Sequence, residues 1–138
     1  YLQEHALNRL GRVVFLSPPN HGIELINRFA WCSWFRDFNG PGGMQLAAGD
    51  TGFVASLQPP DYPVGILMSS RSINPVASIF IPGKDDGRVS IKSAKLEGMR
   101  DFKLISTNHH VIMKKPATIN AAIHFLKNGY FENPRPLP

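Results

Sequence analysis

Arg12-Val13-Val14-Phe15-Leu16-Ser17, followed directly by Pro18-Pro19-Asn20-His21-Gly22, is the stretch that decides the fold of this 138-residue chain. Its first part is a short, nearly continuous apolar run, and the prolines end it because proline lacks the backbone N–H that a sheet needs. Such a run is typical of a strand buried on both faces, as in a parallel sheet. Residues 62–68 and 101–106 are similar runs, and each precedes a polar loop. We therefore expect three parallel strands.

Two segments have the spacing of helices that flank such a sheet. Near the start of the chain, residues 1–10 place apolar side chains at helical spacing, and Gly11 follows them as a stop signal. Residues 118–128 are predicted to form an amphipathic helix, with Pro116 near its start and Gly129 beyond its end. The apolar face of that helix carries Ile119, Ala122, Ile123 and Leu126. Strands that alternate with helices predict an α/β fold, a parallel sheet flanked by helices, in a single domain spanning residues 1–138.

The segment 23–38 is unusually rich in aromatic residues. Its aromatic side chains are Phe29, Trp31, Trp34, Phe35 and Phe38, and the last four have the spacing of one helical face. Two interpretations are open: a helix packed on the core, or a mobile helical cap over an active site, in which case residues 23–50 form a cap or lid insertion. The glycine- and proline-rich residues 39–43 are predicted to end the segment as a loop.

Composition excludes several classes of protein. The chain carries 15 Lys and Arg against 10 Asp and Glu, a formal charge of +5, but the cations are scattered and only Lys114-Lys115 are adjacent. Nucleic-acid binding needs a clustered basic surface, so we expect no nucleic-acid partner. No apolar stretch approaches the roughly 20 residues of a membrane span, and no secretory leader is visible. The single cysteine, Cys32, cannot form an internal disulfide, which favours a reducing, cytoplasmic compartment.

Two polar loops carry the residue types of a hydrolytic site. The first, residues 83–89, contains Asp85 and Asp86, and the second, residues 107–110, contains His109 and His110. Each loop follows a predicted parallel strand, so both lie at the carboxyl edge of the sheet, where such groups converge. A metal site is not expected, because side chains adjacent in sequence point in diverging directions. The order acid then histidine matches that of a hydrolase triad.

The chain resembles the C-terminal half of bacterial α/β-hydrolases of the lipase and esterase type. Three motifs carry the resemblance: the turn 17–22 that ends the first strand, the Asp86-Gly87-Arg88-Val89 turn followed shortly by serines, and a histidine between the last strand and the closing helix. The resemblance implies that Asp86, the acid followed by Gly-x-Val, is the triad acid. It also implies that His109, seven residues before Pro116 (116 − 109 = 7), is the catalytic histidine.

The sequence departs from the family in its nucleophile. No Gly-x-Ser-x-Gly elbow occurs in it, and the resemblance places the elbow and the oxyanion-binding amides upstream of Tyr1. We therefore expect this chain alone to be inactive and to need no cofactor or metal. Other serines, Ser17 after the first strand and the group Ser69, Ser70 and Ser72 after the second, lack the flanking glycines of the elbow.

Three functions follow from these observations. The first is the C-terminal portion of a carboxylic-ester hydrolase that acts on a small-molecule or lipid ester with Asp86 and His109. The second is a non-catalytic interaction module derived from an α/β-hydrolase, which associates through the exposed edge of the strand 12–17 with a complementary N-terminal segment or with a second copy. The third is an autonomous small esterase that uses a different serine.

Overall fold

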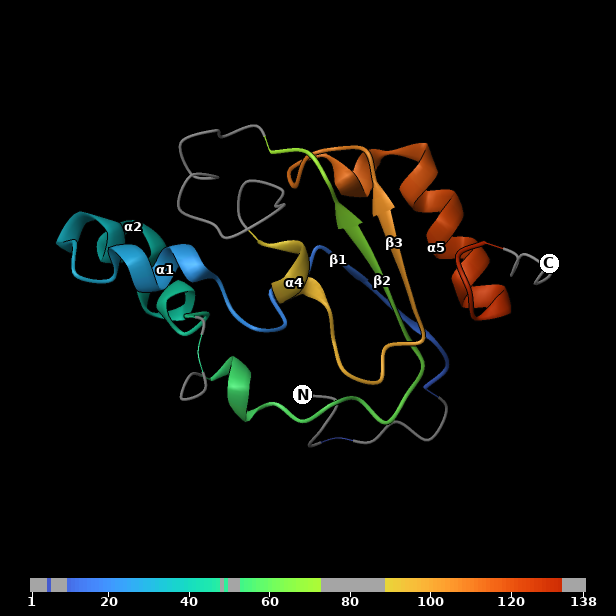
Figure 1. Cartoon of the computed structure of the whole chain (residues 1–138), viewed down its shortest axis with the longest axis horizontal. Helices are drawn as coiled ribbons and strands as arrows, with labels where there is room; N and C mark the ends of the chain where they lie inside the picture. The colour runs from blue at the N-terminus through green and yellow to red at the C-terminus, as the bar shows by residue number, and fades with distance from the viewer. Residues whose placement is uncertain (1–4, 6–9, 48, 50–52, 73–88, 133–138) are drawn as a thin grey trace.

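A three-stranded parallel sheet forms the centre of the computed structural model, which describes residues 5, 10–47, 49, 53–72 and 89–132. The strands are β1 (Val13–Leu16), β2 (Val64–Ser69) and β3 (Asp101–Ile105), in the order β1-β2-β3. Every residue of β2 is buried, as expected for the central strand of a sheet covered on both faces. The predicted parallel sheet is confirmed, with helices on its flanks as in an α/β fold (Figure 1).

One face of the sheet packs against α5 (Pro116–Asn128). The core there joins Leu67 and Ile105 of the sheet to Ala121 and Phe125 of α5 and to Phe131 just beyond it. The opposite face carries α4 (Ile91–Ala94), whose Ala94 packs with Met68 and Val89. Figure 1 shows α4 and α5 on opposite sides of the strands.

The limits of α5 follow from its terminal residues. Pro116 stands in its first turn, where proline costs no hydrogen bond, and Gly129 ends it in the left-handed conformation at φ 86°. Arg12 donates to the last-turn carbonyls of Leu126 and Lys127 at 2.8 and 3.0 Å, and its positive charge suits the helix C-terminus. The predicted helix is confirmed.

The apolar face of α5 that the sequence emphasised does not form the core. Ile119, Ile123 and Leu126 are largely exposed, whereas Thr118, Ala121 and Phe125 face the sheet. Helical spacing shows that a stripe is apolar, but α5 has apolar residues on more than one side, and packing selects the side that carries the large ring of Phe125.

Helices α1 (Glu24–Phe29) and α2 (Ser33–Met44) lie to one side of the sheet (Figure 1). The predicted loop at residues 39–43 is wrong in its extent, because two helical stretches, together named α2, meet there at a kink and continue to Met44. The kink falls at Gly40, whose φ of 66° suits glycine, and the following Pro41 has no N–H to donate to the preceding turn.

The interpretation of the aromatic segment as a core-packed helix is also wrong. Trp31, Trp34 and Phe38 are 76%, 66% and 81% exposed, and α2 contains no buried residue. The partly buried ring of Phe35 instead contacts the ring of Phe29, with centroids 5.6 Å apart. The aromatic residues therefore form a small local cluster apart from the sheet.

The ends of the α1–α2 segment meet. Ile23 and Ala47 form an isolated parallel bridge, and the Ile23 N–H donates to the Leu46 carbonyl at 2.7 Å. The chain therefore leaves the body of the fold after Gly22 and returns close to the same point, as an inserted segment would.

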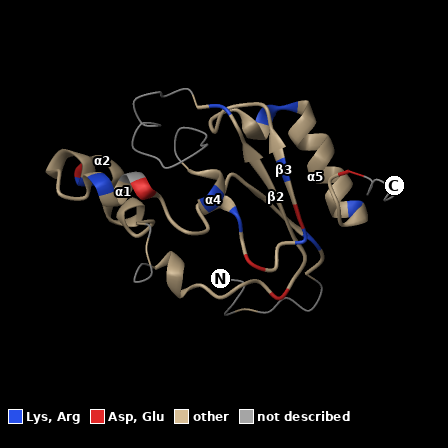
Figure 2. Ribbon diagram, in the orientation of Figure 1, with Lys and Arg blue, Asp and Glu red and all other residues tan. Residues whose placement is uncertain are grey.

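The remaining described elements are two short 3₁₀ helices, η1 (Val54–Ser56) and η2 (Ile112–Lys114). The predicted opening helix at residues 1–10 lies almost wholly outside the described residues. None of the helices within the described ranges combines the length and apolar character of a bilayer-spanning segment. Lys and Arg residues are distributed over several elements of the ribbon in Figure 2, with acidic residues among them.

Candidate functional site at the carboxyl edge of the sheet

The loops that follow β2 and β3 are joined at the carboxyl edge of the sheet. Past the end of β2, the Ser70 N–H donates to the Ile105 carbonyl at 3.1 Å, and the Arg71 N–H donates to the Thr107 carbonyl at 2.9 Å. These bonds extend the parallel pairing beyond the strands. The segment 107–110 is thereby held next to the segment that leaves β2.

His109 lies on a turn four residues after the end of β3 and is half-buried, whereas His110 is exposed. The Asn108 side-chain oxygen accepts from the His110 N–H at 3.1 Å, which is an Asx turn. The two imidazole rings lie 6.1 Å apart with their planes 83° to one another. The rings therefore meet edge to face, and the two histidines differ in burial, since His109 is the less exposed of the pair.

The predicted acid Asp86, and its neighbour Asp85, lie outside the described residues. The chain is described again from Val89, which is buried against Met68 near the end of β2. Ser90 then caps α4: its hydroxyl oxygen accepts from the Ser93 N–H at 3.0 Å. The residues immediately after the Asp86 turn are thus fixed on the carboxyl half of the sheet.

Glu24 joins the α1–α2 segment to Ser90 at the start of α4, and the sequence analysis did not single it out. The Ser90 hydroxyl donates to Glu24 Oε1 at 2.7 Å, while Glu24 Oε2 is buried with no hydrogen-bond partner. The signal that could have found Glu24 is a carboxylate at the start of an otherwise apolar and aromatic segment.

The turn after β1 is bound to α4 by three further hydrogen bonds. The Asn20 amide donates to the Ala94 carbonyl at 2.8 Å, and the His21 N–H donates to the Ser93 carbonyl at 3.0 Å. The Ser93 hydroxyl in turn donates to the Gly22 carbonyl at 2.5 Å. The Pro-Pro-Asn-His-Gly turn therefore supports the segment that follows Asp86, although the two are some 70 residues apart in sequence.

Two of the alternative serines have a structural role. Ser17 and Ser69 are buried, their hydroxyl oxygens are 2.8 Å apart, and the Ser69 N–H donates to Ser17 Oγ at 3.0 Å. Ser17 has φ 45°, the left-handed region that costs a non-glycine residue roughly 1–2 kcal/mol. The Ser70 hydroxyl is close to the Ile105 carbonyl, at 3.3 Å. The hydroxyls of Ser17 and Ser69 thus bond within the fold instead of facing a substrate.

Within the described ranges, no three His, Cys, Asp or Glu side chains come close enough together to hold a metal ion. No family model, curated protein or solved structure matches this chain. The chemistry of the site is therefore argued from its own residues.

Proposed function

We propose that this chain supplies the acid and the histidine of a serine-type carboxylic-ester hydrolase. The observation that carries the proposal is the convergence of three loops at one edge of the sheet. The turn after β1 is bound to α4, the Val89–Ser90 segment is anchored beside the end of β2, and the His109 turn is tied to the segment after β2. An acid in the Asp86 turn is three residues from Val89, within about 11 Å of extended chain.

In the proposed reaction, His109 accepts the proton of a serine hydroxyl as the serine attacks the ester carbonyl. It then gives that proton to the departing alcohol, and afterwards activates the water that hydrolyses the acyl-serine. Asp86 fixes the tautomer of the imidazole and stabilises the imidazolium as it forms. The serine and the oxyanion-binding amides are contributed by polypeptide outside this sequence, since no elbow motif occurs within it.

The α1–α2 segment fits the role of a cap in this proposal. Its two ends meet at Ile23 and Ala47, it lies away from the sheet, and it exposes Trp31, Trp34 and Phe38. Glu24, at its base, is bonded to Ser90, four residues after Asp86. A movement of the cap would therefore displace Ser90 and, through it, the nearby proposed acid.

The test uses the protein as its full coding region encodes it, assayed on short-chain p-nitrophenyl esters. His109→Ala is expected to lower kcat/KM by a factor on the order of 10⁴ or more, and Asp86→Asn by a comparable factor. The adjacent variants His110→Ala and Asp85→Asn are the matched controls, with changes of a few-fold. Absence of ester hydrolysis, or equal losses for His109 and His110, would contradict the proposal.

A second candidate function, an interaction module, is favoured by the edge of β1. Among the described residues β1 pairs only with β2, and Leu16 at the end of β1 is an exposed apolar residue. The neighbouring helix α5 also exposes apolar side chains, those of Ile119, Ile123 and Leu126. An unpaired edge next to an apolar helix is a template for another strand. Sedimentation of this polypeptide as concentration-dependent dimers would support that candidate, and a monomer at all concentrations would exclude self-association.

A further inference from the structure

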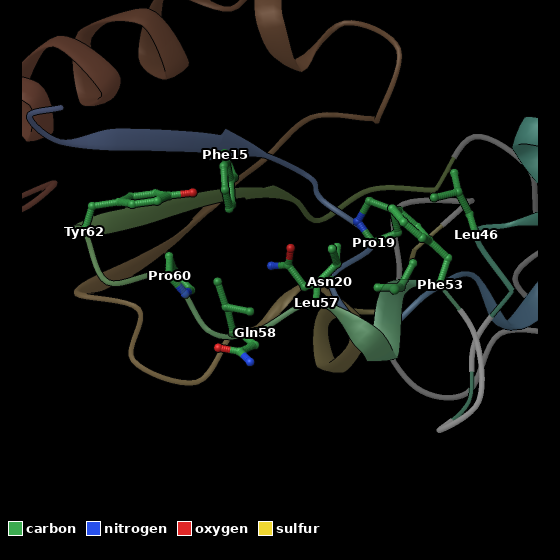
Figure 3. Close-up of a pocket in the computed structure, with 11 residues that line it drawn as sticks. Phe15, Pro19, Asn20, Leu46, Phe53, Leu57, Gln58, Pro60 and Tyr62 are labelled. Carbon is green, nitrogen blue, oxygen red and sulfur yellow. The ribbon is translucent and has the colours of Figure 1, made fainter. Parts of the chain in front are cut away.

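A long apolar groove lies on the face of the sheet opposite α5. It has a volume of about 430 Å³, and Phe15 of β1 contributes to its wall (Figure 3). Tyr62 and Pro60 stand at one end of the groove, while Phe53 and Leu46 stand at the other. This volume is in the range of small-molecule sites in proteins, which are mostly apolar.

The chemistry of the groove is that of a hydrocarbon site. None of the described side chains that line it is charged, and its surface is predominantly apolar. Of the few polar groups, the Asn20 amide already donates to the Ala94 carbonyl. Phe53 and Leu57, at the rim, are largely exposed although they are apolar. Apolar side chains held open around a hollow indicate an apolar occupant.

The groove has about the length of one strand, and one of its ends lies at the carboxyl edge of the sheet. Tyr62 precedes β2, and Pro19 follows β1, so the groove runs along the four residues of β1. Four residues of strand correspond to about 13 Å. Pro19 is two residues beyond Ser17, at the carboxyl edge where the histidine loop also lies. An apolar space of this length can hold an unbranched hydrocarbon chain.

We propose that the groove binds an unbranched hydrocarbon chain, in the role of the acyl chain of the ester substrate. The acyl role rests on the proposed hydrolase function, whereas binding of the chain does not. The acyl group therefore lies against Phe15 of β1 and Val54 of η1.

The experiment is calorimetric titration of this polypeptide with n-alkanoates from hexanoate to dodecanoate, each below its micelle concentration. These ligands have no ester bond, so binding is measured without catalysis. One-to-one binding is expected, with affinity rising about fourfold for each methylene group. The rise should stop once the chain is longer than the groove. No binding by any alkanoate, or binding without dependence on chain length, would overturn the inference. The groove would then be interpreted as a contact surface for polypeptide.

Two leucines of equal exposure provide the matched variants. Leu57 lines the groove and Leu126 lies on α5, across the sheet, and each is 47% exposed. Leu57→Trp is expected to weaken dodecanoate binding at least tenfold, and Leu126→Trp to leave it unchanged; equal weakening by both contradicts a specific site. Tyr62→Leu shortens a residue at one end of the groove and should move the chain-length limit upward, a gain that a folding defect cannot imitate.

Two experimental outcomes distinguish hydrocarbon binding in the groove from ester hydrolysis at the catalytic pair. If alkanoates bind but the full-length protein hydrolyses no ester, the groove is a hydrocarbon site and the proposed catalytic role is wrong. If esters are hydrolysed without dependence on acyl length and no alkanoate binds, the catalytic pair is supported and the groove is not the acyl site.

Discussion

Gly65, in the middle of β2, is the point at which the sheet and its covering layer come closest. A Cβ atom at this position would lie 2.6 Å from Phe125 Cε2 and 2.7 Å from Phe131 Cζ. Carbon atoms that are not bonded normally stay about 3.5–4.0 Å apart, so Gly65→Ala requires both rings to retreat by about 1 Å.

Neither ring can retreat freely. Phe125 is fully buried among Leu67, Ile105 and Ala121, and the two rings pack against each other with centroids 4.8 Å apart. The backbone of Phe131 is also fixed, because its N–H donates to Asp101 Oδ2 at 2.6 Å. Overpacking of this kind costs roughly 1–3 kcal/mol, against a gain of about 0.4–1 kcal/mol from stiffening the unfolded chain. We expect a net loss of about 1–1.5 kcal/mol, the difference between the middle values of these two ranges.

Urea denaturation followed by far-ultraviolet circular dichroism measures this loss. With a slope of roughly 1–3 kcal/mol per molar urea, the midpoint of Gly65→Ala should fall by roughly 0.5–1 M. The control is Gly11→Ala, where no atom lies within 4 Å of the added Cβ, and its midpoint should stay the same or rise slightly. In the double variant Gly65→Ala/Phe131→Leu, the smaller side chain makes room, so the cost should be less than the sum of the two single costs. An unchanged midpoint for Gly65→Ala, or strict additivity in the double variant, would refute the packing argument.

Two other positions give predictions of stability. Ser17→Ala keeps the left-handed backbone and removes the hydroxyl that accepts from the buried Ser69 N–H, so it should cost about 2 kcal/mol in urea unfolding. Ser17→Gly removes the same hydroxyl but relieves the backbone strain, so it should cost about 1 kcal/mol less. Equal costs for the two variants would show that the backbone at φ 45° is not strained. Arg12→Met removes the two bonds to the end of α5 but keeps most of the aliphatic stem, so a loss of about 0.5–1.5 kcal/mol is expected, with faster hydrogen exchange confined to the last turn of α5 as its signature. Uniformly faster exchange across the sheet would argue against a local capping role.

The site was predictable from the sequence only in part. Loops after parallel strands converge at one edge because parallel strands run in one direction, so the position of His109 at that edge could be read from the order of elements. The hydrogen bonds from Ser90 to Glu24 and from the Asn20 amide to the Ala94 carbonyl could not be predicted, because the partners are about 70 residues apart in sequence. The local sequence pattern of one segment contains no information about which distant segment it will contact.

What the sequence determined by itself is the set of elements: three strands, because their apolar runs can be buried only inside a sheet, and the last helix, because Pro116 and Gly129 set its ends. What only the tertiary structure decided is which surfaces meet. It placed Phe125 of α5 on the sheet and left Ile119 outside, exposed Trp31 and Trp34, and required Gly65 under two rings. The physical reason is that periodicity records which residues avoid water within one element, whereas burial depends on the volume and position of a partner from a distant part of the chain.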